Sequence, residues 1–466
     1  MSYKLLLLSA LVLCSSLSTL GQLSGESAIS ASTYWSSDSS LPFWFTHNRD
    51  GKIIGHSASA QVVNIQANYK YKNILGSPFS IRAGTDVLAC YSKKGYLQFN
   101  ELYAAISAFK FKLEAGYFTD DEVLNGLSST NMQIDRSLNA RPLPKLRFAT
   151  DGFIPFFFWK DWFWYKAEYD EGLLGSNQYV TGAHLHHKSL FAKVKFKKET
   201  YFSIGLNHWV MWGGLSPEYG QLPYDFESYF LYITGREGSS KFPATDRQNV
   251  AGNQLGSYYM ELLLRKPNQD ITLYYSHPFE DKSGMEYDNW RDNLLGISIL
   301  FKNKKFIEQV VYEYMHTKHQ SGDTHLYGYM RGRDNYFNHG YYKSGFTYEG
   351  FTMSSPVFSP LRYNEKGIVT GISNTRLSMH HLAARGQVSR SIKWDGRITL
   401  THNLGTYDVP YSPPIWMLYT QFAFSYSTPS FPVELSVSVG ADAGKIDEFQ
   451  HDNNRIGIAV NVSKRW

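Results

Sequence analysis

The chain of 466 residues has only two cysteines, and it has no long apolar run after its first twenty residues. A helix needs about 18 or more consecutive apolar residues to cross a membrane, so a bundle of membrane-spanning helices is excluded. If an N-terminal leader that contains Cys14 is removed, Cys90 remains alone, which excludes an intramolecular disulfide and a cysteine-based metal site. The sequence also lacks basic blocks and aromatic–basic motifs, so we expect no nucleic-acid partner.

Aromatic residues are abundant, although the chain is polar on average. There are 34 Tyr, 30 Phe and 11 Trp, together with 37 Gly, while the mean hydropathy is negative. A transmembrane β-barrel needs this combination, because each of its strands has one apolar face toward lipid and one polar face toward the interior.

The last thirteen residues, 454–466, alternate between apolar and small or polar side chains. Successive side chains of a strand point to opposite faces, so this pattern predicts a strand with one apolar face. Its length suits a membrane crossing, and Trp466 would lie at the membrane–water boundary. A free strand edge is forbidden in lipid, so we expect this strand to pair with an early strand and close a barrel. The alternative is an edge strand of a soluble sandwich. The alternating apolar residues are Ile456, Ile458, Val460 and Val462.

About a dozen similar runs occur from Gln61 onward, separated by Gly, Asn, Asp and Pro. In the first run Val63, Ile65 and Ala67 share one face. Such a series is typical of repeated hairpins rather than of a sandwich, whose strands are rarely so polar on one face. The sequence therefore predicts an all-β membrane protein, a closed antiparallel transmembrane β-barrel over residues 61–466, with long extracellular loops.

Residues 1–21 have the pattern of a signal peptide. Lys4 provides the basic region, an apolar stretch follows, and Thr19-Leu20-Gly21 is a cleavage site before Gln22. We therefore expect export, and residence in the outer membrane of a Gram-negative bacterium. Residues 22–60 are expected to be an N-terminal lead or plug segment, either a short helix or a flexible stretch.

Three segments interrupt the alternation, at residues 119–175, 213–256 and 316–371. Long loops of outer-membrane barrels face outside, and the turns at the other end are short. We expect at least the last two segments on the extracellular side or in the lumen. Prolines at Pro142 and Pro144 favour a buried connector or plug in the first segment.

The segment from Arg331 to Tyr342 is the densest cluster of polar and aromatic residues. Aromatic faces stack on sugar rings, amides and carboxylates bind sugar hydroxyls, and arginines pair with uronate or phosphate. The alternative is a loop whose polar groups satisfy one another. A second candidate is the aromatic segment 209–214, which is either a sugar platform or part of an interfacial girdle. The candidate polysaccharide-binding residues are Trp212, Arg331, Arg333, Asp334, Asn335, Tyr336, Asn338, His339 and Tyr341.

Several pieces of sequence, in their order and spacing, resemble the Wzi-type capsule-assembly family of Gram-negative outer membranes. The resemblance implies a closed barrel of about eighteen strands. It also implies a lectin-like role in holding capsular polysaccharide at the cell surface, without catalytic residues. The lead at residues 22–40 is short for the periplasmic helical bundle of well-known members. The matching pieces are Leu41-Pro42-Phe43-Trp44, residues 127–145, Trp212-Gly213-Gly214 with Pro217, residues 252–258 and residues 334–340.

Two other functions compete with polysaccharide binding. A porin-like diffusion channel for sugars or anions would use Lys193, Lys195 and Lys197 as lumen residues. An outer-membrane hydrolase would need His339 and Ser344 together, but residues five apart on a strand face opposite ways. G-x-S-x-G, H-E-x-x-H and phosphate-loop motifs are absent. We therefore expect a monomer that is not an enzyme and has no cofactor, with capsular polysaccharide, outer-membrane lipids and the barrel-insertion machinery as partners.

Overall fold

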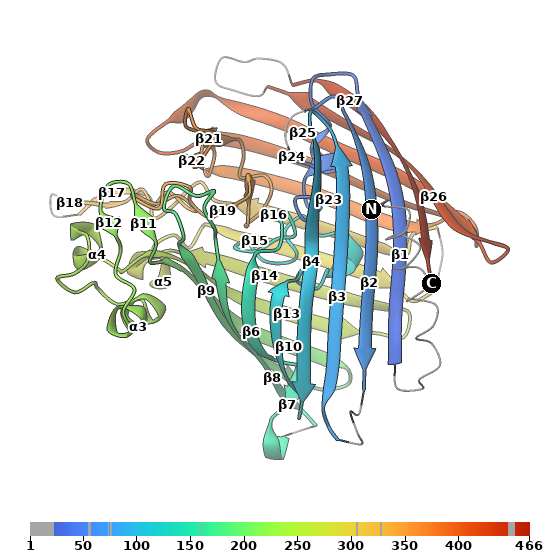
Figure 1. Ribbon diagram of the computed structural model, residues 1–466, viewed down its shortest axis with the longest axis horizontal. Helices are drawn as coiled ribbons and strands as arrows, with labels where there is room; N and C mark the ends of the chain where they lie inside the picture. Colours follow the sequence, from blue (N-terminus) through green and yellow to red (C-terminus); the bar gives the residue numbers. More distant parts are fainter. Residues whose placement is uncertain are drawn as a thin grey trace, which may run out of the picture.

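The computed structural model describes residues 23–54, 57–72, 74, 77–159, 161–303, 306–326, 329–445 and 453–466. The expected signal peptide at residues 1–21 lies outside these residues. Most described residues belong to one antiparallel sheet that closes on itself (Figure 1).

The sheet contains nineteen strands, and β6 and β7 share one position in the wall because both pair with β8. The wall is therefore a closed barrel of eighteen positions, as expected. The strands are β1 (Leu23–Ser36), β2 (Ser59–Tyr71), β3 (Ser80–Tyr91), β4 (Gly95–Ala108), β5 (Phe111–Tyr117), β6 (Pro144–Thr150), β7 (Ile154–Pro155), β8 (Phe163–Leu173), β9 (His184–Lys195), β10 (Thr200–Trp212), β13 (Asn253–Arg265), β14 (Gln269–Phe279), β15 (Asn293–Phe301), β16 (Gln309–His316), β23 (Leu377–Gln387), β24 (Ile392–Gly405), β25 (Pro410–Thr428), β26 (Phe431–Gly444) and β27 (Arg455–Arg465).

The remaining elements are short and belong to the connections. No helix in the described ranges is both long and apolar enough to cross a membrane. These elements are α2 (Phe43–Thr46), α3 (Phe226–Thr234), α4 (Ala244–Gln248), α5 (Lys282–Met285), the 3-10 turns η3 (Leu124–Gly126) and η4 (Phe157–Trp159), and the two-stranded pairs β11 (Leu215–Ser216) with β12 (Gly220–Gln221), β17 (Asp323–Leu326) with β18 (Tyr329–Gly332), β19 (Thr347–Tyr348) with β20 (Phe351–Thr352), and β21 (Leu361–Tyr363) with β22 (Val369–Ile372).

The barrel closes where the last strand, β27, pairs with the first, β1. The register runs from Ala28 opposite Arg465 to Ser36 opposite Gly457. Beyond it, the amide of Trp466 donates to the carbonyl of Ser27 at 2.9 Å. This pairing leaves no free edge in the wall, which confirms the prediction that the C-terminal strand pairs with an early strand.

The structure differs from the expected boundary at residue 60, because the wall already begins at Leu23. Strand β1 pairs with β2 on one side and β27 on the other. Its alternation is hard to see in the sequence, since serine and alanine differ little in polarity, although Ile29 and Trp35 do point outward. The following stretch turns into the barrel, where Phe43, Trp44 and Phe45 of α2 are buried. This part of the expected segment therefore lies inside the barrel.

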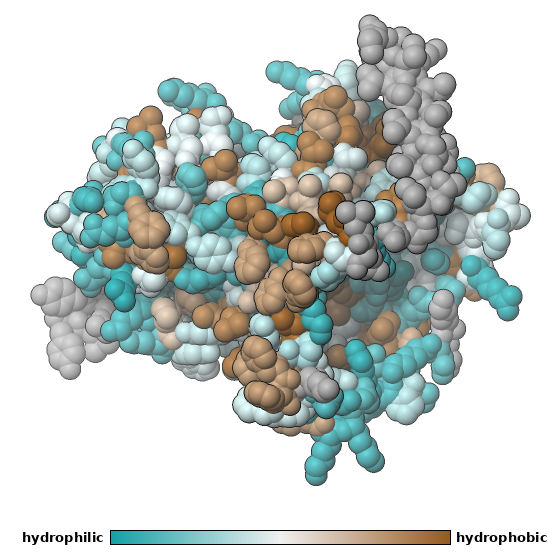
Figure 2. Space-filling view, turned by 60° about the horizontal axis from the view of Figure 1, so that its bottom comes forward, coloured by the Kyte–Doolittle hydropathy of each residue, from teal (hydrophilic) through white to brown (hydrophobic). Residues whose placement is uncertain are grey.

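The outer surface of the wall is apolar. Ile458, Val439 and Val437 are each more than two-fifths exposed although they lie in mid-strand. Figure 2 shows apolar side chains across the middle of one face and hydrophilic ones toward its margins. An apolar band of this kind is what a barrel presents to lipid, which agrees with an outer-membrane location.

The two ends of the barrel differ in the length of their connections. At one end the connections are short, such as residues 109–110 and 429–430, and this end also holds Leu23 and Trp466. At the other end lie residues 213–252, 280–292 and 317–376, with helices α3 and α4 (left in Figure 1). Since outer-membrane barrels carry their long loops outside, the second end is the extracellular one.

Candidate functional site

A connection between β5 and β6, residues 118–143, crosses the interior of the barrel; we call it the lumen segment. Its residues Ser128 and Ser129 are buried and donate hydrogen bonds from their hydroxyls to Glu313 of β16. One step earlier, the carbonyl of Leu127 lies 2.9 Å from Nε2 of His381 on β23. The segment is therefore anchored to wall strands far from its own ends, as expected for a plug.

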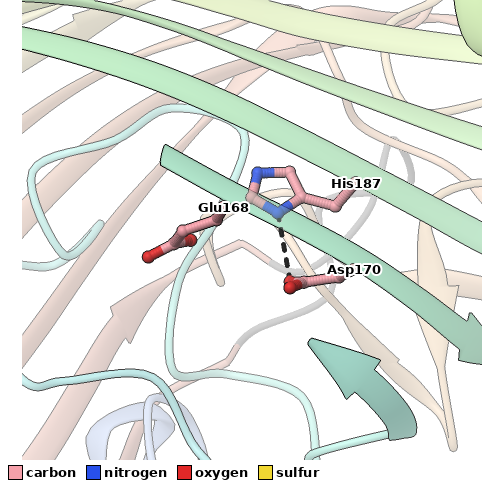
Figure 3. Close-up of side chains that lie close together, drawn as sticks. All are labelled: Glu168, Asp170 and His187. Carbon is pink, nitrogen blue, oxygen red and sulfur yellow. Dashed lines mark hydrogen bonds and ion pairs between the residues drawn. The ribbon is translucent and has the colours of Figure 1, made fainter. Parts of the chain in front are cut away.

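Glu168, Asp170 and His187 lie close together on β8 and β9 (Figure 3), with ligand atoms within 4.8 Å of one another. The types of residue would suit a metal ion. However, Nε of Arg147 lies 2.8 Å from Asp170 Oδ1, and Nη1 of Arg136 lies 3.4 Å from Glu168 Oε2. Because guanidinium groups already pair with both carboxylates, the cluster fits an ion-pair network better than a metal site.

The network joins the lumen segment to the wall. Arg136 belongs to the segment, and it also pairs with Asp120 near the start of the segment. The Nη2 atom of Arg147, on β6, lies 2.8 Å from Asp120 Oδ1. These buried and half-buried charges hold the segment in place beneath the extracellular loops.

Tyr336 and Tyr341 are buried, which differs from the expectation that their rings face bound sugars. Tyr336 is fully buried, and its hydroxyl donates to Asp292 Oδ2 at 2.9 Å. Tyr341 is 2% exposed, and its hydroxyl donates to Asp246 Oδ2 at 2.6 Å. Both tyrosines therefore anchor the loop to neighbouring connections. These two residues fit the alternative of a loop whose polar groups satisfy one another. The sequence does not show this, because their partners lie on distant loops.

Four other predicted residues meet in one place, a polar pocket of about 540 Å³ among the extracellular loops, which we call the outer pocket. Asn338 shapes it, since its Nδ2 donates to Asn335 Oδ1 at 2.8 Å and its Oδ1 accepts from the amide of Ile372 at 2.7 Å. The four predicted residues in its lining are Asp334, Asn335, Asn338 and His339.

Burial changes the protonation of two of these side chains. It raises the pKa of Asp334 to about 7, against the lowering effect of the hydrogen bond that Ser321 donates. It lowers the pKa of His339 to about 4, so this imidazole is neutral at pH 7. The Nδ1 atom of His339 accepts from the amides of Tyr341 and Tyr342 at 3.4 and 3.2 Å.

The remaining predicted residues do not line the outer pocket. Trp212, at the end of β10, stacks on His184 with ring centroids 4.5 Å apart. Arg333 is exposed and its guanidinium carbon lies 6.0 Å from the ring centre of Tyr407. The side chain of Arg331 lies outside the described part of the chain.

Ser344 does not form a catalytic pair with His339 in the described structure. Its hydroxyl is buried and donates to the carbonyl of Val369 at 2.9 Å. It also accepts from the amide of Tyr179 at 2.8 Å. A nucleophile needs a base within hydrogen-bond reach, so the geometry offers no hydrolase site here.

Sequence reasoning missed the pocket residues that come from other loops. They lie up to about 160 positions apart along the chain, so no local pattern could connect them, although one matched piece of sequence, residues 252–258, borders the pocket. These missed residues are Asp246, Glu280, Asp281 and Asp408, and Lys343 and Arg362 of the same connection as the predicted residues were missed as well.

A solved structure shares the barrel fold of this chain. The chain is similar in structure to Wzi of Escherichia coli, an outer-membrane protein involved in group 1 capsule assembly and described as a carbohydrate-binding β-barrel. The TM-score is 0.57 at 11% identity, covering 93% of this chain and 83% of that chain. OccK5 (OpdH) and OprD of Pseudomonas aeruginosa give TM-scores of 0.48 at 9% and 7% identity, covering 95% and 96% of this chain and 98% and 93% of theirs. No similar protein is found among the curated proteins.

A family model gives a more specific result than the shared fold. The model for capsule assembly protein Wzi matches residues 39–367, well over half of the chain. The match includes the buried helix α2, the lumen segment and most of the outer pocket. The chain therefore belongs to the family of the capsule assembly protein Wzi.

Proposed function

We propose that this protein binds capsular or other surface polysaccharide at the outer pocket and attaches it at the cell surface. The observation that carries the proposal is the pocket itself, which lies at the extracellular end of the barrel and is lined by amide, carboxyl, imidazole and cationic side chains. Such groups bind sugar hydroxyls. Membership of a capsule-assembly family supports the same function.

A flat surface for a sugar ring is available beside the pocket, although not from Tyr341. Tyr219 is about half exposed, and its ring lies edge-on to that of Tyr341 with centroids 5.6 Å apart. An exposed aromatic face of this kind can stack on the apolar face of a pyranose. We therefore add Tyr219 to the proposed contacts.

Binding at a single pocket is expected to be weak, because exposed hydrogen bonds contribute about 1 kcal/mol each. A long polymer can engage many barrels at once, so that avidity holds it at the surface. This mode of attachment also allows individual sugar units to exchange while the polymer stays bound.

The porin-like alternative requires an open lumen, and the structure offers little support for one. The lumen segment crosses the interior, and buried side chains from Phe43 to Met379 form one apolar cluster with the extracellular loops above it. Of the lysines expected to line a channel, Lys195 pairs with Glu199 at 2.6 Å near the short-turn end. An interior crossed by this segment favours attachment over diffusion.

The direct test is binding of the purified barrel to polysaccharide extracted from the capsule of its own cells. Gly340 lines the pocket, is exposed, and has no atom within 4 Å of a Cβ built on it. The Gly340→Trp variant should fill the pocket without disturbing the fold and should weaken binding at least tenfold. Gly95→Trp is the matched control, since Gly95 is also exposed at the extracellular end but lies outside the pocket. Equal binding by both variants would remove the pocket from the function.

A further inference from the structure

The outer pocket has more acidic than basic groups. Five carboxylic acids line it, against the two cations Lys343 and Arg362, and His339 is neutral at pH 7. The acids come from four separate connections, so the imbalance belongs to the assembled pocket and not to one run of sequence. They are Asp246, Glu280, Asp281, Asp334 and Asp408.

One of the two cations is already balanced by a carboxylate outside the pocket lining. The ammonium of Lys343 pairs with Oε1 of Glu218 and lies 4.9 Å from the ring centre of Tyr179. Arg362 is exposed at the rim, and no described residue forms a hydrogen bond or ion pair with its side chain. Arg362 is therefore the one lining cation whose charge is available to a ligand.

None of the five acids pairs with a cation in the described part of the chain. Burial raises the pKa of Asp246, Glu280 and Asp334, so the negative charge of the pocket rests mainly on Asp281 and Asp408. Asp408 is exposed, and the described part of the chain provides no hydrogen bond or ion pair to its side chain. Asp281 accepts hydrogen bonds from the amides of Ser283 and Gly284 at 2.8 and 3.4 Å, but it pairs with no described cation. The charges of Asp281 and Asp292 add to burial in raising the pKa of Asp334, which is the response of a carboxyl in a negative environment.

We infer that the outer pocket accepts polysaccharide segments without carboxylate or phosphate groups and binds them more tightly when they carry an amine. This inference rests on the proposed function and specifies its ligand. A uronate or phosphate would bring a further negative charge against Asp281 and Asp408, while an ammonium would pair with them. The sequence leaves the charge of the polymer open and gives Arg331 and Arg333 a role only if the polymer is acidic.

The inference is tested with three hexasaccharides that share a β-1,4-linked gluco backbone and differ in charge. They are the N-acetylglucosamine hexamer, the glucosamine hexamer and the glucuronate hexamer, measured at pH 6 and low salt on the full barrel in detergent. The expected order of affinity is amine above neutral above acid, with steps of about threefold, the scale of an exposed ion pair.

Variants separate the pocket from the overall charge of the protein. Asp408→Lys should lower the affinity for the amine hexamer about tenfold, because it changes the local charge by two. Asp161→Lys makes the same change at an exposed site in a short turn at the opposite end, and it should leave all three affinities unaltered.

Three results would overturn the inference, namely equal or tighter binding of the glucuronate hexamer, an order that Asp408→Lys does not change, or no binding of any hexamer. The proposed function survives any of these results if the capsular polysaccharide of the cells still binds the wild type and not Gly340→Trp. If neither the polysaccharide nor a hexamer binds, the proposed function fails as well.

Discussion

The backbone amide of Ser129 donates a hydrogen bond to Oε2 of Glu313 at 2.8 Å, which joins the middle of the lumen segment to wall strand β16. The other oxygen of the same carboxylate accepts from the hydroxyl of Tyr274 at 2.7 Å. Glu313 is fully buried, and its hydrogen bonds therefore count for more than they would in water. This one side chain links the lumen segment to the wall of the barrel.

Replacing Glu313 should loosen the lumen segment. Glu313→Ala leaves buried hydroxyl and amide donors unpaired, at a cost of about 1–3 kcal/mol for each group left unsatisfied. We expect a wild-type barrel that is almost silent in planar lipid bilayers and a Glu313→Ala barrel that shows frequent openings. Glu313→Gln keeps one acceptor oxygen for the amide of Ser129, and its NH2 can donate to the hydroxyls of Ser128 and Tyr274, so it should behave nearly as the wild type. A wild-type barrel with a large, steady conductance would instead support the porin alternative.

The buried ion pairs of Arg147 should contribute to stability. Arg147→Met leaves the carboxylates of Asp120 and Asp170 with fewer partners, and breaking a buried pair in this way costs about 3–5 kcal/mol. The folded band of the unboiled protein should therefore disappear at a lower temperature in gels. Lys166→Met removes a more exposed partner of Glu168 and should have little effect. Equal heat resistance of the two variants would show that the network does not hold the lumen segment.

The wall could be predicted from sequence because period-two alternation is a local signal. Val437 and Val439 point outward as that period requires. The first strand was missed, since small residues such as serine, alanine and glycine lie on both of its faces and hide the alternation. Its pairing with β2 and β27 shows that it belongs to the wall. The strand β25 also contains prolines, which sequence reasoning does not place in a strand.

The site could be predicted only in part, for a similar reason. Asn335 and Asn338 lie within one short segment, and the composition of that segment drew attention to them. Asp246 and Asp408 reach the pocket from other loops, so only the fold brings them together. Burial of Tyr341 depends on Asp246, almost a hundred positions away, and the local sequence cannot distinguish such an anchor from an exposed sugar platform.

The loop around Asp334 should loosen as the pH rises. Its folded pKa of about 7 lies above the value of about 3.9 in an unfolded chain. The folded loop thus binds more protons, and its stability falls between about pH 4 and pH 7. Trypsin cleavage after the exposed Arg333 should therefore increase from pH 5.5 to pH 8, relative to Asp334→Asn at each pH. A cleavage ratio that stays constant across this range would contradict the prediction.

Trp466 should help the barrel to assemble. It is 56% exposed at the end of the closing strand, while its backbone extends the pairing with β1. We propose that the insertion machinery recognises this strand, so deletion of Trp466 should lower the amount of heat-modifiable protein in the outer membrane several-fold. Trp466→Phe keeps an aromatic ring and should restore most of it. Wild-type levels after the deletion would count against recognition of this end.

Retention of capsule by living cells tests the central claim most directly. Cells whose only copy is Gly340→Trp should insert the barrel at the normal level yet release polysaccharide into the medium, because the outer pocket is filled. Cells with Gly95→Trp should keep their capsule, and the readout is the ratio of cell-bound to released polysaccharide at matched levels of folded barrel. A full capsule on the Gly340→Trp cells would contradict attachment through this pocket.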